Sequence, residues 1–247
     1  MDGVTREGWL GLEGPRLVEE AMQASATATI QSVLAGQSAT AKFQSLIARL
    51  PAQTEIIAVS DRMFAQIAAT ETPQGIAALV EIKPPDFESI LTRPGVLLLV
   101  ACGIQDPGNL GTIIRSGQAL GADALIALRE TVSPFNPKTV RASAGAILRF
   151  PIFRNQEAAP LFERLRRAQV RLIAADRHSK TPLADADLKN SVAFLIGREA
   201  SGLHPEVATA ADITLSIPIR PETDSVNAAA AASIFLYEAA RQRGFRY

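Results

Sequence analysis

Short apolar runs alternate with amphipathic segments through the second part of the chain. The apolar runs resemble strands buried on both faces of a parallel sheet, and they lie at 96–102, 124–128, 170–175, 192–197 and 212–217, with a shorter segment at 150–153. The segments between them have the apolar spacing of helices, and they lie at 109–122, 138–145, 157–168, after Pro205 and at 226–240. This alternation predicts an α/β domain with a parallel sheet over residues 95–247.

The pattern of the first 82 residues predicts a smaller α/β unit. One helix begins near Pro15 and has Leu17 and Val18 on its apolar face. Further helices are predicted near 43–50 and 63–70, and strands at 55–60 and 75–82. Prolines at 84, 85 and 94 then interrupt the pattern, so we predict a domain of residues 1–82 and a linker of residues 83–94.

The composition is that of a globular protein, with 47% hydrophobic and 20% charged residues. No apolar run reaches the ~18 residues that a membrane span needs, and residues 1–10 do not resemble a signal peptide. We therefore expect a cytoplasmic protein without a membrane segment. With Cys102 as the single cysteine and only His178 and His204 beside it, we also expect no metal. Both histidines are interpreted as ordinary loop residues.

The formal net charge is zero, but the charge is unevenly distributed along the chain. Residues 1–90 contain 6 Lys and Arg against 11 Asp and Glu, whereas residues 91–247 contain 19 against 14. Of the 25 basic residues 20 are Arg, whose planar guanidinium matches the geometry of phosphate. The second part of the chain is therefore the better candidate for contact with a phosphate-rich partner.

Polar loops follow the predicted strands of the second domain. In open α/β sheets, ligands bind at the loops that leave the carboxyl ends of the strands. The corresponding loops here are GIQDPGNLG (103–111), AADRHSKT (174–181), GREASGL (197–203) and PIRPETDS (218–225). The chain has no GxGxxG after a strand, no GxxxxGK[ST] and no GxSxG, so dinucleotide-binding, P-loop and hydrolase functions lack their motifs.

Three stretches resemble the motifs of the SpoU (TrmH-type) RNA ribose methyltransferases of the SPOUT superfamily. DPGNLGTIIRS (106–116) resembles the first motif, FLIGREASGL (194–203) the second, and the stretch 217–243 with its alanine run the third. NPKTVRASAGAILRFPI (136–152) is similar to the sequence that joins the first two motifs. Residues 6–80 resemble the accessory substrate-binding domain that some members carry in front. The resemblance covers nearly the whole chain.

The resemblance implies a parallel α/β domain whose C-terminal part forms a trefoil knot, a topology that sequence patterns alone would not predict. It also implies a homodimer that binds S-adenosylmethionine in the knotted loops. The residues implied to hold this cofactor are Gly197, Ile217 and Val226. The residues implied to form the active site are Asn109, Arg115, Glu199, Ser225 and Asn227.

Several of these residues also have a purely structural interpretation. Asn109 could cap the helix that follows Pro107, and Glu199 could be a solvated loop acid. Arg115 could be an ordinary surface residue, although its place in the motif favours a function. Lys138 and Arg141 share a helical face, which suits an RNA phosphate contact or a solvated basic surface equally.

The third motif departs from the pattern of the family. The family usually has a glycine-containing turn and Ser-Leu-Asn-Val, whereas this chain has Arg-Pro-Glu-Thr at 220–223 and Ser-Val-Asn-Ala at 225–228. The shape of the loop and the target can therefore differ from those of other members. The proton acceptor for the attacking hydroxyl is not assigned. Arg115 is not expected to take this role, because guanidinium does not deprotonate in proteins.

Together the motifs predict 2′-O-methylation of a ribose in ribosomal RNA, since an accessory front domain suits a large structured target. A transfer RNA or a drug-resistance rRNA methyltransferase would use the same chemistry. A non-catalytic RNA-binding or assembly factor of the same fold is a further alternative. The joint presence of Asn109, Arg115, Ser225 and Asn227 argues against that factor, because binding alone does not need them.

Overall fold

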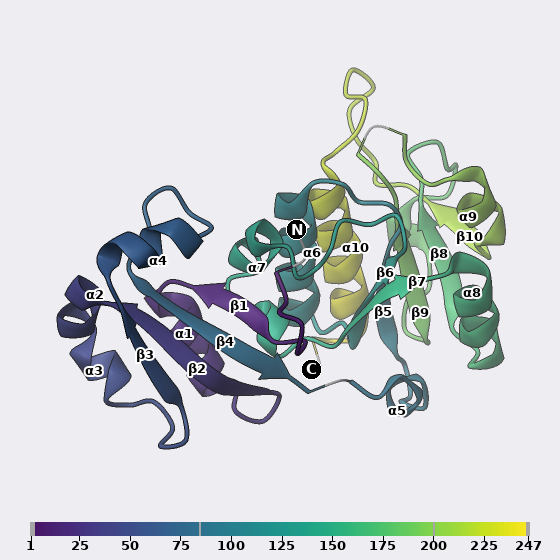
Figure 1. The fold of residues 1–247 in the computed structure, drawn as a ribbon. Helices are drawn as coiled ribbons and strands as arrows, with labels where there is room; N and C mark the ends of the chain where they lie inside the picture. Colours follow the sequence, from purple (N-terminus) through teal and green to yellow (C-terminus); the bar gives the residue numbers. More distant parts are fainter. Residues whose placement is uncertain (1–2, 84, 200, 246–247) are drawn as a thin grey trace.

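The computed structural model describes residues 3–83, 85–199 and 201–245. Two α/β domains lie side by side, each built on its own sheet (Figure 1). The N-terminal domain, here called the front domain, contains four strands in the order β1-β4-β2-β3. The C-terminal domain, here called the rear domain, contains six in the order β10-β8-β9-β5-β6-β7. No helix among these residues is long and apolar enough to cross a membrane.

The front domain contains two strands that the sequence pattern does not predict, β1 and β2. Its strands are β1 (Leu10–Glu13), β2 (Ala28–Gly36), β3 (Glu55–Val59) and β4 (Ile76–Ile82), and its helices are α1 (Pro15–Gln23), α2 (Gln37–Lys42), α3 (Gln44–Ile47) and α4 (Asp61–Ile67). β2 is rich in small residues, and a register shift between Ile30 and Ser32 interrupts its alternation of buried and partly buried residues. Pairing with β3 and β4 on its two sides therefore decides its structure.

The segment predicted as a linker contains a short helix, α5 (Phe87–Leu91). Asp86 caps this helix, because its side chain accepts hydrogen bonds from the backbone N–H groups of Glu88 and Ser89. Phe87, Ile90 and Leu91 are buried in the core of the rear domain. The prolines thus flank an ordered element that packs on the rear domain.

All six strands of the rear sheet are parallel, as predicted. They are β5 (Leu97–Ala101), β6 (Ala124–Leu128), β7 (Ile152–Gln156), β8 (Arg171–Ala175), β9 (Val192–Ile196) and β10 (Ile213–Leu215). Every residue of β5, β6 and β9 is buried. Their continuous apolar runs reflect this position between two layers of helices.

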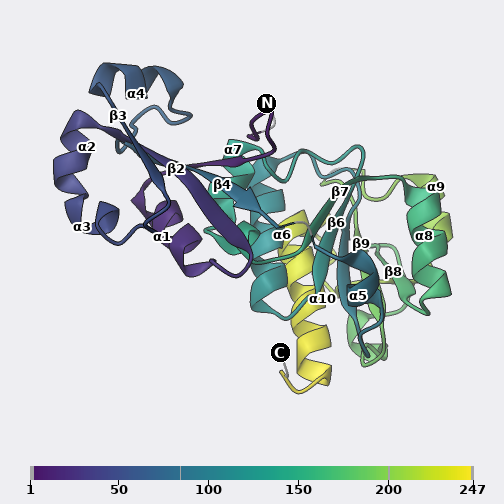
Figure 2. The same cartoon turned by 60° about the horizontal axis from the view of Figure 1, so that its bottom comes forward.

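Helices cover both faces of the rear sheet (Figures 1 and 2). They are α6 (Pro107–Ala119), α7 (Pro137–Ala142), α8 (Ala158–Arg167), α9 (Pro205–Ala210) and α10 (Ala228–Gln242). α6 and α10 lie on the face toward the front domain, and α8 and α9 lie on the opposite face. α7 packs closely on α6 at Gly111, where an added Cβ would lie 2.4 Å from Ala142 Cβ.

The two domains share one apolar core. A single cluster of buried side chains runs from the front sheet to α6 and α10. At the junction, Arg149 Nη1 lies 2.7 Å from Glu20 Oε2, and Thr27 Oγ1 donates to the carbonyl of Leu148 at 2.7 Å. The front domain is therefore packed firmly against the rear one.

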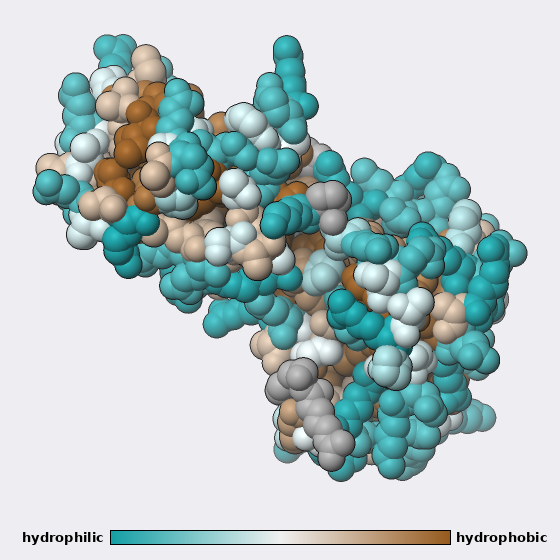
Figure 3. Space-filling view, turned by 90° about the horizontal axis from the view of Figure 1, so that it is seen from below, coloured by the Kyte–Doolittle hydropathy of each residue, from teal (hydrophilic) through white to brown (hydrophobic). Residues whose placement is uncertain are grey.

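Large apolar side chains are also exposed on the outer part of the front domain. Figure 3 shows apolar surface gathered there, and the exposed residues of this domain are Ile56, Ile57, Met63 and Ile67. They belong to the edge strand β3 and to helix α4. This surface lies away from the junction between the domains (Figure 2).

Candidate active site

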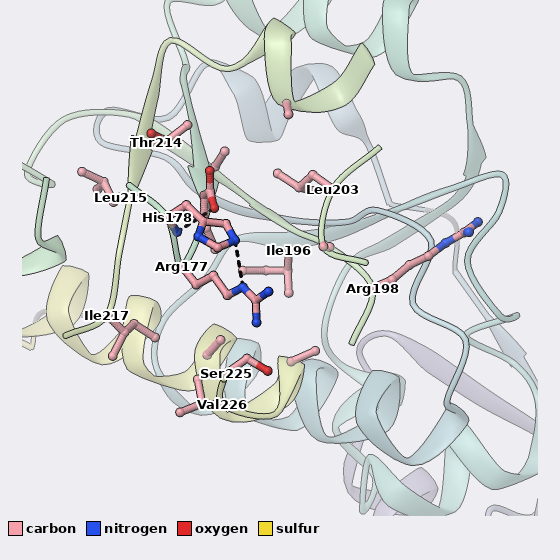
Figure 4. A pocket seen from close by; sticks show the side chains of 18 of the residues that line it. Arg177, His178, Ile196, Arg198, Leu203, Thr214, Leu215, Ile217, Ser225 and Val226 are labelled. Carbon is pink, nitrogen blue, oxygen red and sulfur yellow. Dashed lines mark hydrogen bonds between the residues drawn. The ribbon is translucent and has the colours of Figure 1, made fainter. Parts of the chain in front are cut away.

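A cavity of about 260 Å³ lies where β8, β9 and β10 end and α10 begins (Figure 4). Its apolar lining includes Ile196, Leu203, Leu215, Ile217 and Val226. Its polar lining includes Asp176, Arg177, His178, Arg198, Glu199, Ser201, Thr214 and Ser225. Loops at the carboxyl ends of parallel strands thus form a pocket with both apolar and polar lining residues.

The three residues that the resemblance assigns to the cofactor all line this cavity: Gly197, Ile217 and Val226. Gly197 has a clear steric reason to be glycine. A Cβ there would lie 2.4 Å from the carbonyl carbon of Gly202 and 2.5 Å from the nitrogen of Leu203. The loop folds back tightly at this point, since the backbones of Arg198 and Gly202 exchange two hydrogen bonds.

A row of side-chain hydrogen bonds joins the three motifs. Asn109 Nδ2 donates to Glu199 Oε1 at 2.7 Å, and Asn227 Nδ2 donates to Asn109 Oδ1 at 2.9 Å. Asn227 Oδ1 accepts in turn from the first N–H groups of α10, at Ala229 and Ala230. These three side chains are far apart in the sequence and meet beside the pocket, which Glu199 lines and Asn109 and Asn227 do not.

Asn109 is not the cap of α6. Asp106 fills that position, because its Oδ1 accepts from the backbone nitrogen of Asn109 at 2.7 Å. The amide of Asn109 is therefore free to bridge Glu199 and Asn227. At α10 the cap is Asn227, and Ser225 lies two residues earlier with its side chain exposed at the pocket.

Arg115 lies outside the pocket. It is exposed on α6, and within the described part of the chain its side chain has no hydrogen bond or ion pair. The next residue, Ser116, accepts a hydrogen bond from the hydroxyl of Ser233 on α10 at 2.8 Å. The fold of a single chain thus presents Arg115 on its surface beside α10.

Lys138 and Arg141 lie on α7 and do not reach the pocket either. Lys138 is exposed, whereas Arg141 is half-buried and lines a smaller cavity with Arg16 at the junction between the domains. Among the described residues neither side chain has a hydrogen bond or ion pair. Both guanidinium and ammonium groups therefore stay available at this side of the molecule.

Two pocket residues, Arg177 and His178, are missed by sequence reasoning. Arg177 Nε donates to His178 Nε2 at 3.0 Å, and Arg177 Nη1 donates to the carbonyl of Asp224 at 2.8 Å. The interpretation of His178 as an ordinary loop residue is incomplete, because its ring lines the cavity (Figure 4). The signal was their place in a polar loop that directly follows a buried strand.

The described residues include no group of three or more His, Cys, Asp and Glu side chains that could hold a metal ion. The thiol of Cys102 is buried at the end of β5, and burial raises its pKa well above the usual range for cysteine. It therefore stays protonated and does not act as a nucleophile.

A family model described as the SpoU rRNA Methylase family matches residues 96–237, and one described as an MRM3-like substrate binding domain matches residues 5–78. The 23S rRNA (uridine(2479)-2′-O)-methyltransferase of Streptomyces viridochromogenes is 34% identical over 77% of this chain and 69% of its own length. The 23S rRNA (guanosine(2553)-2′-O)-methyltransferase RlmP of Bacillus subtilis is 30% identical over 92% of this chain and 86% of its own.

Solved structures give the same result. The crystal structure of the SpoU methyltransferase AviRb from Streptomyces viridochromogenes, in complex with AdoMet, superposes with a TM-score of 0.85 and 30% sequence identity. The superposition covers 96% of this chain and 91% of that one. The matching models, the relatives and this shared fold confirm the resemblance of the three motifs, and the chain belongs to the SpoU rRNA methylase family.

Proposed function

We propose that this protein transfers a methyl group from S-adenosylmethionine to the 2′-hydroxyl of a ribose in ribosomal RNA. The observation that carries the proposal is the hydrogen-bonded row of Glu199, Asn109 and Asn227, in which Glu199 lines the pocket. It brings the polar residues of all three motifs together at one place. Two relatives that are named 23S rRNA 2′-O-methyltransferases support ribosomal RNA as the substrate. A cytoplasmic location is part of the same proposal.

The chemistry of the pocket fits S-adenosylmethionine. Ile196, Leu203 and Leu215 offer apolar surface to an adenine ring, and the carboxylate and guanidinium groups of the same lining suit a charged amino-acid part. Gly197, Ile217 and Val226 are proposed to hold the cofactor, largely through backbone groups. When bound, S-adenosylmethionine supplies the electrophilic methyl group.

The residues of the chain are proposed to align the ribose for attack on that methyl group, which is the main contribution expected of such a site. Ser225 and Asn227 orient the ribose, and Asn109 holds Asn227 in place through its hydrogen bond. Glu199 fixes the amide of Asn109 and so organises the loop after β9. Arg115 clamps the phosphate of the target nucleotide and stabilises the negative charge that develops on the ribose oxygen.

A homodimer would bring Arg115 to a pocket, and we include it in the proposal. Arg115 is exposed on α6 without a partner in the described part of its own chain. The neighbouring α10 exposes Ile234 and Tyr237, and the ring of Tyr237 lies 5.7 Å from that of Phe245. Apolar side chains of this size on a helix surface suit an interface between subunits. The trefoil knot implied by the resemblance stays a prediction.

The proposal is tested by mapping 2′-O-methylated nucleotides in total RNA from cells with and without the gene. We expect one ribosomal RNA site to lose its methyl group when the gene is deleted and to regain it with the purified protein and S-adenosylmethionine. The Asn109→Ala variant should not restore it. Loss of a methyl group from transfer RNA would support the alternative substrate. An unchanged methylation map, with RNA binding retained, would favour a non-catalytic assembly factor.

A further inference from the structure

Arg177 is the arginine whose charged end faces the candidate cofactor pocket. The pocket is also lined by Arg198, but Arg198 forms an ion pair with Glu130 and its side chain points away from the cavity in Figure 4. The guanidinium of Arg177 instead lies between the ring of His178 and the turn at Ser225 and Val226. Within the part of the pocket that the structure describes, no carboxylate forms an ion pair with it.

Two hydrogen bonds fix the orientation of this guanidinium. Its Nε donates to Nε2 of His178, and its Nη1 donates to the backbone carbonyl of Asp224. The backbone nitrogen of His178 donates to Asp176 Oδ1 at 2.9 Å, which holds the loop after β8 in a turn. Arg177 has five N–H donors in a rigid plane. Neither bond goes to a carboxylate, so the charge and the remaining donors are available to a ligand.

The remaining charges of the pocket are carboxylates. Asp176 and Glu199 line the same cavity. A ligand that carries one carboxylate together with an ammonium and a sulfonium group would find an opposite charge for each part. S-adenosylmethionine has this combination in its methionine part. The adenosine part of the same ligand has no carboxylate, so the two parts make separable demands on the protein.

We propose that Arg177 binds the carboxylate of the methionine part of S-adenosylmethionine, held in position by His178 and by the carbonyl of Asp224. The inference rests on the proposed cofactor and adds the residue that selects a ligand with an intact amino-acid end. Guanidinium and carboxylate form paired, charge-assisted hydrogen bonds that are stronger than neutral ones. Arg177 also links the loop after β8 to the loop that carries Ser225.

Calorimetry on the whole chain described above, with two ligands, tests this assignment. S-adenosylhomocysteine carries the carboxylate, whereas 5′-methylthioadenosine has the same nucleoside and sulfur without the amino-acid end. In the Arg177→Ala variant we expect the affinity for S-adenosylhomocysteine to fall at least about tenfold. The affinity for 5′-methylthioadenosine should change less than about twofold. Arg177→Lys keeps the charge and should lose less than the alanine variant.

Lys180→Ala is the matched control, because Lys180 is exposed in the same loop and has no side-chain partner in the described chain. It should bind both ligands as the wild type does. Equal losses for both ligands in Arg177→Ala would overturn the proposal, since they would show that Arg177 only shapes the loop. Unchanged affinities would overturn it as well. A wild-type protein that binds neither ligand would instead refute the proposed cofactor itself.

Discussion

At the scale of single residues, the amide of Asn109 is the central connection of the candidate site. It uses its nitrogen toward Glu199 and its oxygen toward Asn227, so one side chain fixes two loops at once. An amide can do this because it carries donors and an acceptor on neighbouring atoms. A carboxylate of the same shape has acceptors only, so asparagine and aspartate are not equivalent at this position.

We therefore predict that Asn109→Asp abolishes methyl transfer without unfolding the protein. The new carboxylate would face Glu199 at hydrogen-bond distance, and the repulsion would displace the loop after β9. The rate of a single turnover should fall by about 100-fold or more, as for the loss of other preorganised polar groups. The free energy of unfolding should change by less than about 1 kcal/mol, because Asn109 is only partly buried and its partners Glu199 and Asn227 are exposed.

Asn190→Asp adds the same charge at an exposed position just before β9 and serves as the control. It should keep the wild-type rate. A rate in Asn109→Asp within a few-fold of wild type would contradict the role of this hydrogen-bonded row.

The residues of the site differ in how far the sequence alone predicts them. Asn109, Glu199 and Asn227 could be found because they belong to motifs, although no pattern indicated that they bond to one another. Arg177 could not be found in this way, because its role depends on a contact with Asp224, 47 residues further along the chain. Arg115 shows the reverse: its motif marks it, whereas the fold of one chain leaves it outside the pocket.

At the scale of elements, α6 and α7 approach so closely that only glycine fits between them. A Cβ on Gly111 would lie 2.4 Å from Ala142 Cβ and 2.6 Å from the carbonyl oxygen of Thr139. Both contacts come from the body of α7, which cannot move aside as the end of a flexible side chain can. The first motif therefore carries a glycine for packing as well as polar residues for the site.

Gly111→Ala is predicted to destabilise the protein. In an open helix this change would stabilise by about 1 kcal/mol, since alanine is the better helix former. Here the overpacking against α7 should outweigh this gain and cost about 1–3 kcal/mol. Chemical denaturation measures the difference, and Gln118→Ala on the exposed side of α6 should stay within about 0.5 kcal/mol. A Gly111→Ala variant more stable than wild type would contradict the packing argument.

The short helix α5 gives a second prediction at this scale. Ile90 is 2% exposed in the core of the rear domain, although sequence reasoning places it in a linker. Ile90→Ala should lower the free energy of unfolding by about 2–5 kcal/mol. Thr92, just after the end of α5, is exposed, so Thr92→Ala should change the free energy of unfolding little. If both variants had the same free energy of unfolding, Ile90 would not belong to the core of the rear domain.

The elements themselves differ in how well sequence predicts them. β5, β6 and β9 are short, continuous apolar runs, and this pattern is typical of strands that are buried on both faces of a sheet. β2 has small and polar residues with a shift in its register, so its own residues favour a strand only weakly. Its pairing with β3 and β4 determines that it forms one. α5 is too short for a periodic pattern, and the prolines around it obscure the cap at Asp86.

At the scale of the whole molecule, the proposed dimer can be tested by asking which subunit supplies Asn109 and which supplies Arg115 to one active site. Asn109 bonds to Glu199, which lines the pocket of its own chain, whereas Arg115 does not line that pocket and, among the described residues, has no bond to it. If Arg115 acts in the pocket of the partner, a dimer of one Arg115→Ala chain and one Asn109→Ala chain keeps one complete site. Its other site lacks both residues.

We predict that each variant alone is inactive and that mixed dimers recover activity. Random assembly from equal amounts should give roughly a quarter of the wild-type rate, because half of the dimers are hybrids and each has one intact site. Differently tagged chains, co-expressed and purified through both tags, isolate the hybrids. No recovery in these hybrids would show that Arg115 acts within its own chain or that the dimer has another geometry.

The described part of the pocket is lined entirely by residues between Ala174 and Phe235, and the front domain contributes none of them. Changes in the front domain would therefore leave the lining of the pocket unaltered. Such changes are limited by the apolar core that the two domains share. A front domain exchanged between relatives would pack correctly only if it kept the residues of this shared core and the partners of Leu148 and Arg149, which are Thr27 and Glu20.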